Sequence, residues 1–327
     1  MGSTLLTTFL ADMARVLVTR RVPNDGLQPL LSAGIAVVQS SGPMSHAALV
    51  DAAPQYDGIV SLLFDVIDGV VLDAGAAGSL KVVANVAVGH DNVDVAAAER
   101  LGIAVCNTPG VLDGSTADLA FLLILAAARR ASEAETDLRS GRWEGGRFDT
   151  YYGVDVHGAV LGVVGFGRIG RAVARRAAGF GMEVIHHTRT DTGFAGWTPD
   201  LDELFARADI VTVHVPLTDE TRNLIDARRI ALMKPTAVFV NTARGLVVDE
   251  EALAIALEKG QIFAAGLDVY QREPEVHPRL LAAPHTTLLP HIGSATSATR
   301  IRMTQLACEG VVAVLEGRRP GNLVTPR

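Results

Sequence analysis

A glycine-rich turn between two apolar runs constrains this chain most. The run Ala159–Val164 leads into Gly165-Phe166-Gly167-Arg168-Ile169-Gly170, apolar residues at helical spacing follow, and a second apolar run begins at Met182. This order predicts strand, turn, helix and strand. In such a unit the first glycine allows the tight turn, the second lets a pyrophosphate approach the backbone, and the third lets the helix pack on the strand. The stretch 159–189 therefore predicts a dinucleotide site, and the alternative is a glycine-rich turn with only a structural role.

The end of the second strand bears on which dinucleotide is bound. An NAD site usually carries Asp or Glu about 20 residues beyond the glycines, whereas an NADP site lacks that charge and has a cation nearby. Here the strand exits into Thr188 and Arg189, while Glu183 stands at its opposite end. We therefore predict that NADPH is preferred over NADH, with Arg189 contacting the 2′-phosphate through its planar guanidinium. The alternatives are NAD as cofactor and a solvated Arg189.

Composition narrows the class of protein. The 327 residues are 49% hydrophobic and only 5% aromatic, which is typical of an α/β protein with a large aliphatic core, and the length predicts two domains. A net charge of −7 without a basic stripe argues against nucleic acid as a partner. The two cysteines, Cys106 and Cys308, lie far apart and outside any CxxC pattern, as expected for buried thiols in a reducing cytoplasm.

Neither of the two most apolar segments predicts a membrane anchor. The run Leu119–Ala128 is about half as long as a membrane helix, so it predicts a core helix. Leu5–Ala11 is preceded by no Lys or Arg and followed by Asp12, unlike a signal peptide. We expect a disordered extension over residues 1–12, with translation starting at Met13 as an alternative.

Short apolar runs alternate with helix-like segments along the rest of the chain. In the first part these runs are Arg15–Thr19, Ile35–Val38, Ile59–Leu63, Val82–Val88 and Ile103–Cys106. In the second part, after Ala159–Val164, they are the run from Met182, Ile210–Val213, Ala237–Val240, Phe263–Leu267 and Thr287–Leu289, separated by helices over Leu201–Ala208, Ala227–Met233 and Asp249–Lys259. Runs that are apolar on both faces predict an α/β fold with two doubly wound parallel-sheet domains.

Two long helices are expected to connect these domains. The segment Asp113–Ser140 predicts one helix that crosses into the second domain, and Ser294–Leu315 predicts a last helix that crosses back. We therefore expect a cofactor domain over 113–297, and a substrate-binding or lid domain made of 1–112 and 298–327.

Polar residues leave three successive strands of the second domain. Arg244 follows one strand, Asp268 ends the next with Glu273 shortly after, and His291 follows the third. Because the carboxyl ends of parallel strands meet at one edge, these side chains should lie on the same edge as the glycine turn. Each also has a plain alternative, as a surface charge, a turn residue or a loop histidine.

The chain resembles the D-isomer-specific 2-hydroxyacid dehydrogenases, and among them the glyoxylate/hydroxypyruvate reductases, over nearly its whole length from about Met13. The matching segments are VGHDNVD at 88–94, NTPGVLDGSTADLAFLLILAAARR at 107–130, GFGRIG at 165–170, HVPLTDETRNLID at 214–226, NTARGLVVDEEAL at 241–253, AGLDVYQREP at 265–274 and LPHIGSAT at 289–296. The resemblance implies a Rossmann-type cofactor domain inserted in a flavodoxin-like substrate domain.

The resemblance also implies a role for each candidate residue. It makes Arg244 the substrate-binding arginine and Glu273 with His291 the acid/base pair, and it gives the substrate carboxylate to backbone N–H groups around Val88 and Gly89. Cofactor contacts are implied for Thr116, Gly165, Phe166, Gly167, Arg168, Ile169, Gly170, Thr188, Arg189, His214, Val215, Pro216, Thr242, Ala243, Asp268, His291 and Gly293. We further expect Leu63 in an apolar wall of the substrate site.

The chemistry of a keto-acid reduction fits these residue types. The carbonyl oxygen must gain a proton, and imidazole is the side chain that titrates near neutral pH, so His291 is the expected general acid. A carboxylate at Glu273 would stabilise the imidazolium, and the Arg244 fork can hold carboxylate and carbonyl oxygens together. One departure is Gln271, which stands where relatives often carry an acidic residue.

Several alternatives remain at this point. The resemblance also fits a 2-ketogluconate reductase, and less well a phosphoglycerate dehydrogenase, since little chain follows the last helix. A non-enzymatic scaffold that senses dinucleotides is a further alternative. A metal site is not expected, because no HExxH spacing occurs and His186 and His187, adjacent on a strand, point to opposite faces. We expect a homodimer formed through the cofactor domain, with the helix 119–128 and Trp143 at its surface.

Overall fold

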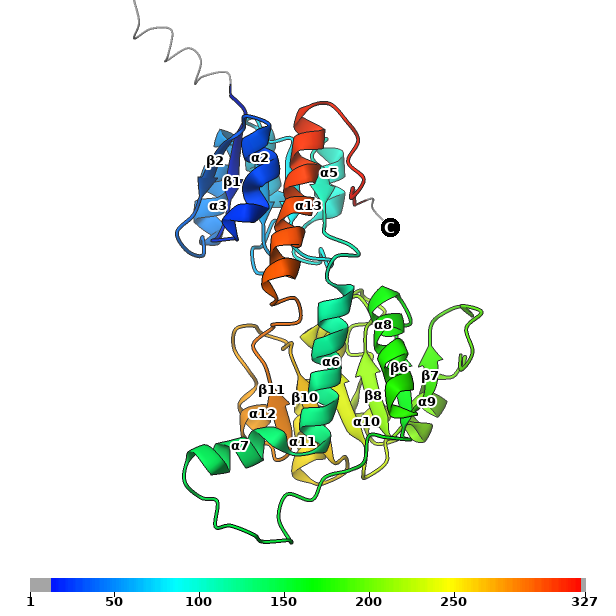
Figure 1. Ribbon diagram of the computed structural model, residues 1–327. Helices are drawn as coiled ribbons and strands as arrows, with labels where there is room; N and C mark the ends of the chain where they lie inside the picture. Colours follow the sequence, from blue (N-terminus) through cyan, green and yellow to red (C-terminus); the bar gives the residue numbers. More distant parts are fainter. Residues whose placement is uncertain (1–12, 325–327) are drawn as a thin grey trace, which may run out of the picture. The chain divides into compact units, whose positions relative to one another are not determined.

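The computed structural model describes residues 13–324, and the predicted extension over 1–12 lies outside the described residues (Figure 1). The chain divides into two compact units. One consists of the described residues of Met1–Leu112 and Ser294–Arg327, and the other of Asp113–Gly293.

The first unit is a parallel five-stranded sheet with helices on it. Its elements are β1 (Arg15–Val18), η1 (Asn24–Leu27), α2 (Gln28–Ser32), β2 (Ala36–Gln39), α3 (His46–Ala52), η2 (Ala53–Gln55), β3 (Gly58–Ser61), α4 (Gly69–Ala76), β4 (Val82–Asn85), α5 (Val95–Arg100), β5 (Ala104–Cys106) and α13 (Ser297–Leu315). The strand order β2-β1-β3-β4-β5 is that of flavodoxin-like folds. The last helix, α13, packs against β4, η1 and α2 (Figure 1).

The second unit is built on a six-stranded parallel sheet. Its elements are α6 (Asp113–Ala128), α7 (Ala131–Arg139), β6 (Val160–Val164), α8 (Arg168–Ala177), η3 (Ala178–Phe180), β7 (Glu183–His187), α9 (Leu201–Arg207), β8 (Ile210–Val213), α10 (Ala227–Ile230), β9 (Val238–Asn241), η4 (Gly245–Val247), α11 (Glu250–Glu258), β10 (Ala264–Leu267), α12 (Pro278–Ala282) and β11 (Thr286–Leu288). The predicted α/β class and the parallel strands of both units are confirmed.

The sheet of the second unit has a vestigial outer strand. The named strands run β11-β10-β9-β8-β6-β7, which leaves β7 at the edge. Beyond it, Trp197 forms a single parallel bridge with His186, and Gly196 O accepts the His186 N–H at 2.8 Å. With that one bridge counted as a strand, the order becomes 3-2-1-4-5-6-7, which is the 3-2-1-4-5-6 order of dinucleotide-binding folds with β11 added as a seventh strand.

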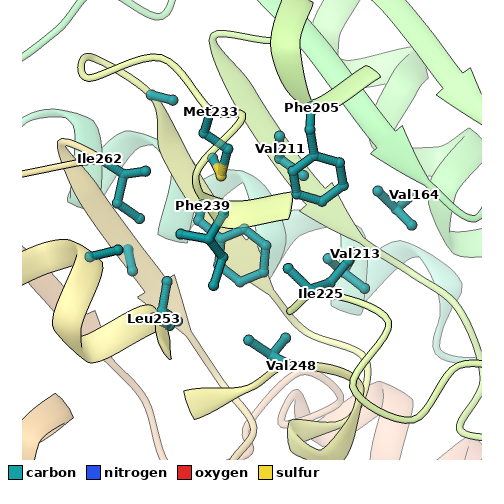
Figure 2. Packing of buried hydrophobic residues seen from close by; sticks show 14 of the residues in the cluster. Val164, Phe205, Val211, Val213, Ile225, Met233, Phe239, Val248, Leu253 and Ile262 are labelled. Atoms are coloured by element: carbon teal, nitrogen blue, oxygen red, sulfur yellow. The ribbon is translucent and has the colours of Figure 1, made fainter. Parts of the chain in front are cut away.

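Both faces of this sheet are buried, which is why its strands read as continuous apolar runs. Successive residues of β9 alternate in direction: Val238 and Val240 pack with α6 and α8, whereas Phe239 packs on the opposite side with α9 and α11. Figure 2 shows that second cluster, in which Phe205, Val211, Phe239 and other side chains interdigitate. The sheet is thereby a rigid base for the loops at its carboxyl edge.

The single long helix predicted over Asp113–Ser140 is wrong. The chain breaks after α6, where Arg130 has a left-handed conformation with φ 51°, and α7 starts afresh at Ala131. The Ala128 carbonyl accepts a hydrogen bond from Val154 N at 2.9 Å, and Gly153 packs so closely on this carbonyl that a Cβ would lie 2.2 Å from it. The returning chain therefore occupies the place where the helix would continue.

Residues 13–324 lack the features of two other kinds of site. None of the helices there combines the length and apolarity that a membrane span requires. That same part of the chain holds no group of three or more His, Cys, Asp or Glu side chains placed to bind a metal ion.

Candidate active site

The glycine turn has the geometry that its three glycines predict. Gly165 has φ 92°, and a Cβ there would lie 2.7 Å from His214 O. At Gly170 a Cβ would lie 2.2 Å from Gly165 O, so only glycine allows α8 to pack here. Gly167, by contrast, has no atom within 4 Å of its Cβ position and gives α8 an N-terminus without a side-chain cap. The turn is thus tight on two sides and open at the glycine where a pyrophosphate would approach.

The loop after β7 carries Thr188 and Arg189. Arg189 is exposed. The pKa of Glu220 is lowered mainly by a hydrogen bond from the Thr218 side chain, and the positive charge of Arg189 lowers it further. Glu183 lies at the start of β7, where its carboxylate forms an ion pair with Arg207 at 3.2 Å. No carboxylate therefore stands at the residues that directly follow β7.

Two of the predicted catalytic side chains form a pair. His291 Nδ1 lies 2.7 Å from Glu273 Oε2, and both side chains are about one-sixth exposed, at 16% and 17%. The other Glu273 oxygen accepts the backbone N–H of Tyr270 at 2.9 Å. Because a carboxylate only accepts hydrogen bonds, Nδ1 carries the hydrogen of this pair, which leaves Nε2 as the ring atom able to exchange a proton.

Asp268 holds the segment that carries His291. Its two carboxylate oxygens accept the N–H groups of Ile292 and Gly293 at 2.7 and 2.8 Å. His291 itself has φ 53°, a left-handed conformation that is strained for a residue other than glycine. The neighbouring Thr116 hydroxyl of α6 donates to Gly293 O at 3.4 Å. The two hydrogen bonds to Asp268 therefore hold the backbone of His291, the proposed general acid, in its strained conformation.

Burial raises the pKa of Asp268. The side chain is 1% exposed, and burial raises its pKa from 3.8 to about 6, against the opposing effects of the two N–H groups and of His291. The folded protein thus binds this proton more tightly than the unfolded chain does. The resulting stability is fully present below about pH 4 and is lost as the pH rises through about 6.

We therefore expect the wild type to lose stability relative to Asp268→Asn as the pH rises. The difference in free energy of unfolding should change by about 2 kcal/mol between pH 4.5 and pH 7.5, since one pKa unit corresponds to about 1.4 kcal/mol. Urea unfolding of both proteins at several pH values measures it. A difference that stays constant with pH would contradict the buried carboxyl.

Arg244 stands at the start of the loop that follows β9. Asn241, the last residue of β9, organises this loop: its side-chain amide donates to Arg244 O at 2.9 Å, and its side-chain oxygen accepts the N–H of Ala243 at 2.9 Å. Arg244, Glu273 and His291 therefore leave β9, β10 and β11, three adjacent strands, at the same edge of the sheet.

The remaining predicted cofactor residues lie at this edge too. His214, Val215 and Pro216 follow β8 directly, and His214 Nε2 lies 2.9 Å from the Thr212 hydroxyl. Thr242 follows β9 and is buried, and its hydroxyl is without a hydrogen-bond partner among the described residues.

The predicted substrate residues of the first unit lie in the loops after β3 and β4. The Asn85 and Asn107 side-chain amides donate to Gly89 O at 3.0 Å and to Val88 O at 2.8 Å. Asn92 ties the two loops together by donating to Leu62 O at 3.1 Å, next to the half-buried Leu63. These two hydrogen bonds to carbonyl groups fix the backbone of residues 88 and 89.

The sequence patterns did not predict two buried carboxylates that hold loops of the candidate site. Asp65 is fully buried, pairs with Arg20 at 2.9 Å and accepts the Leu62 N–H at 2.9 Å, so it holds the loop after β3. Glu250 is 4% exposed and accepts the Gln271 N–H at 2.5 Å. Nothing in the local pattern distinguishes either from a solvated acid, because their partners are distant in sequence.

Comparison with known proteins places the chain in a family. Residues 121–293 match the model of the D-isomer specific 2-hydroxyacid dehydrogenase NAD binding domain. The glyoxylate reductase of Thermococcus onnurineus is 43% identical over 320 residues, which is 95% of each chain.

Solved structures agree with that match. A protein from Thermus thermophilus is 43% identical with a TM-score of 0.89, over 95% of this chain and 100% of its own. The NADPH-dependent glyoxylate/hydroxypyruvate reductase of Sinorhizobium meliloti, in complex with NADP and malonate, is 34% identical with a TM-score of 0.87, over 96% and 97%. The chain described here therefore belongs to the D-isomer specific 2-hydroxyacid dehydrogenase family.

Proposed function

We propose that this protein reduces a small 2-keto acid, glyoxylate or hydroxypyruvate, to the corresponding 2-hydroxy acid, the D isomer where the product is chiral, with NADPH as the reductant. The observation that carries the proposal is the Glu273–His291 pair, at 2.7 Å, on the sheet edge that also carries Arg244. The names of the similar glyoxylate reductases support this substrate class.

The residues fit a bound dinucleotide. The open space at Gly167 and the uncapped start of α8 suit a pyrophosphate, and the buried Thr242 hydroxyl offers a polar contact. When bound, NADPH supplies the hydride that reduces the carbonyl carbon.

The side chains of the site bind the substrate and supply the proton that the carbonyl oxygen needs. Arg244 binds the carboxylate and the carbonyl oxygen of the substrate through its fork, which orients the carbonyl and stabilises negative charge on its oxygen. His291 donates the Nε2 proton to that oxygen, and Glu273 stabilises the imidazolium form before transfer and keeps the ring in place. Asp268 keeps the strained His291 backbone in position through Ile292 and Gly293.

A panel of 2-keto acids tests the proposal directly. Loss of NADPH absorbance at 340 nm is expected with glyoxylate and hydroxypyruvate, and weaker or no loss with 2-ketogluconate. The reverse ranking would favour a 2-ketogluconate reductase. No oxidation with any 2-keto acid, combined with tight NADPH binding, would favour the scaffold alternative.

Arg189 is proposed to set the cofactor preference. We expect the wild type to have a higher kcat/KM with NADPH than with NADH, because Arg189 can bind the 2′-phosphate and no acid follows β7 directly. Arg189→Ala should lower the NADPH value at least tenfold and change the NADH value less than threefold, as expected for one charge-assisted contact of about 1.5–3 kcal/mol. Arg207→Ala, in which the arginine lost pairs with Glu183, is the control. An equal or better value for NADH in the wild type would remove this assignment.

We propose a homodimer because the loop 140–159, between α7 and β6, exposes aromatic side chains. Figure 1 shows this loop projecting away from the sheet of its unit, and it exposes Trp143 at 64% and Phe148 at 93%. The helix 119–128 contributes less than its sequence predicts, because most of it is buried against its own sheet and Leu122 is its main exposed apolar residue. Exposed aromatic residues on a projecting loop are typical of a surface that a second copy covers.

Light scattering measures this oligomeric state. A dimer mass is expected at micromolar concentration, and Phe148→Asp should shift the protein toward monomer. A monomer mass for the wild type would contradict the proposal.

We also propose a reducing, cytoplasmic compartment. Both Cys106 and Cys308 are buried free thiols, and burial raises the pKa of each to about 12. Thiols of this kind persist where disulfides do not form.

A further inference from the structure

The buried carboxylate of Glu250 has no role in the reaction proposed above. It belongs to the first turn of α11, yet Asp249 already caps that helix by accepting the Ala252 N–H at 3.0 Å. Glu250 is 4% exposed, whereas the next residue, Glu251, is partly exposed and pairs with Arg279 and His277. Burial of a carboxylate costs free energy unless hydrogen bonds or an ion pair offset the loss of water, so the partners of Glu250 show what it stabilises.

What Glu250 holds is the loop that leads to Glu273. Its Oε1 accepts the backbone N–H of Gln271 at 2.5 Å. The Gln271 side-chain amide also donates, to Val248 O at 2.6 Å. Gln271 donates both hydrogen bonds, one from its backbone and one from its side chain, to two residues of the segment 248–250, so neither segment can slide without breaking one of them.

A close backbone contact also joins these two loops, and we call the contact and the two hydrogen bonds of Gln271 together the clamp. Gly245 lies against the peptide that joins Tyr270 and Gln271, and a Cβ there would be 1.9 Å from Tyr270 C. No side chain fits between the two loops, which therefore touch through their backbones. The residue just before this glycine is Arg244, and the residue two positions beyond Gln271 is Glu273.

Glu250 lies next to the loop that carries Glu273, because its carboxylate accepts the Gln271 N–H. Burial raises the pKa of Glu250, and Glu273 raises it further by repulsion, while the Gln271 N–H, His277 and Arg272 favour the charged form. Glu250 thus faces the loop 271–273.

We propose that Glu250 and Gln271 are positioning residues that fix the separation between Arg244 and Glu273, and through Glu273 the ring of His291. The inference rests on the proposed roles of those three side chains. Neither clamp residue touches the substrate; each acts on the spacing of the loops, to which hydride transfer is sensitive because about 1 Å of misplacement costs up to about a hundredfold in rate.

Steady-state kinetics with glyoxylate test the clamp through a matched pair of variants. Glu250→Ala should lower kcat about tenfold and leave the dissociation constant for NADPH within about twofold, because the glycine turn lies on other elements. Glu251→Ala removes the same side chain from the next position of α11 and should leave kcat within about twofold. Glu250→Gln keeps an oxygen that can accept the Gln271 N–H and should recover most of the rate.

Three results would overturn the proposal. The first is a Glu250→Ala variant that turns over as fast as Glu251→Ala, and the second is a Glu250→Gln variant as slow as Glu250→Ala. If Glu250→Ala does not fold, Gln271→Met breaks the other hydrogen bond without disturbing α11. The third result is an unchanged kcat in that variant.

Hydrogen exchange separates this inference from the proposed function. In Glu250→Ala, amides of the segment 268–275 should exchange faster than in the wild type, while Glu251→Ala leaves them unchanged. If the wild type reduces no 2-keto acid but this difference is observed, the reductase proposal fails and the clamp stands. Unchanged exchange refutes the clamp whatever the substrate is.

Discussion

Replacement of His291 by alanine is expected to lower kcat for glyoxylate reduction by at least a hundredfold. The physical reason is that a positioned general acid contributes about 10²–10⁴-fold, and the His291 ring pairs with Glu273 at 2.7 Å on the sheet edge that also carries Arg244. The dissociation constant for NADPH should change little, because the glycine turn is on β6 and α8. Stopped-flow and steady-state assays with fluorescence titration of NADPH separate the two effects.

His285→Ala provides a matched control for His291→Ala. His285 also has a left-handed backbone, with φ 54°, but it precedes β11 at the opposite edge and its Nδ1 lies 3.0 Å from Phe263 O. Alanine is equally strained at both positions, so a loss that is specific to His291 is chemical and not conformational. A variant His291→Ala that keeps more than one-tenth of kcat would exclude this residue as the acid.

Arg244→Lys is expected to lower kcat/KM for glyoxylate by about a hundredfold, and Arg244→Ala by more. Lysine keeps the charge but lacks the planar fork that holds two oxygens at once, so both substrate binding and stabilisation of the developing negative charge suffer. Loss of a single donor to such a charge costs about 10²–10³ in rate. The expected signature is a raised KM together with a lowered kcat.

Arg272→Ala controls for the general loss of positive charge. Arg272 is exposed and lies in the loop that carries Glu273, so its removal changes the local field without removing the fork. We expect its kcat/KM to stay within about threefold of the wild type. Equal losses in Arg272→Ala and Arg244→Lys would show that Arg244 acts through charge alone and would refute bidentate binding.

The sequence predicted the parts of the site that follow from strand ends. Arg244, Asp268, Glu273 and His291 could be placed on one edge because parallel strands deliver their carboxyl ends to the same side. The three glycines could be assigned separate roles for a similar reason, since each role follows from the order of strand, turn and helix. The roles of the catalytic set and of Arg189 stay predictions until the experiments above are done.

Other features depend on contacts that no local pattern reveals. Glu250 looks like an ordinary acid at a helix N-terminus, and its burial depends on Gln271, which is 21 positions away. The break between α6 and α7 has no glycine or proline to announce it, because it comes from the chain that returns at Gly153. The spacing of residues along the chain cannot predict side-chain burial or turns that depend on partners far away in the sequence.

The single bridge made by Trp197 has a consequence for how cofactor choice could change over time. The ten residues from Thr188 to Trp197 leave the edge of the sheet and rejoin it beside His186, so the ladder between β6, β7 and β8 forms without them. Gly196 is the exception, because a Cβ there would lie 2.2 Å from Val184 O. Exchanges at the exposed residues 189–191 therefore break no hydrogen bond of the main ladder. On the proposed role of Arg189, a change of cofactor preference falls in this segment, apart from the strands β9, β10 and β11 that precede Arg244, Glu273 and His291.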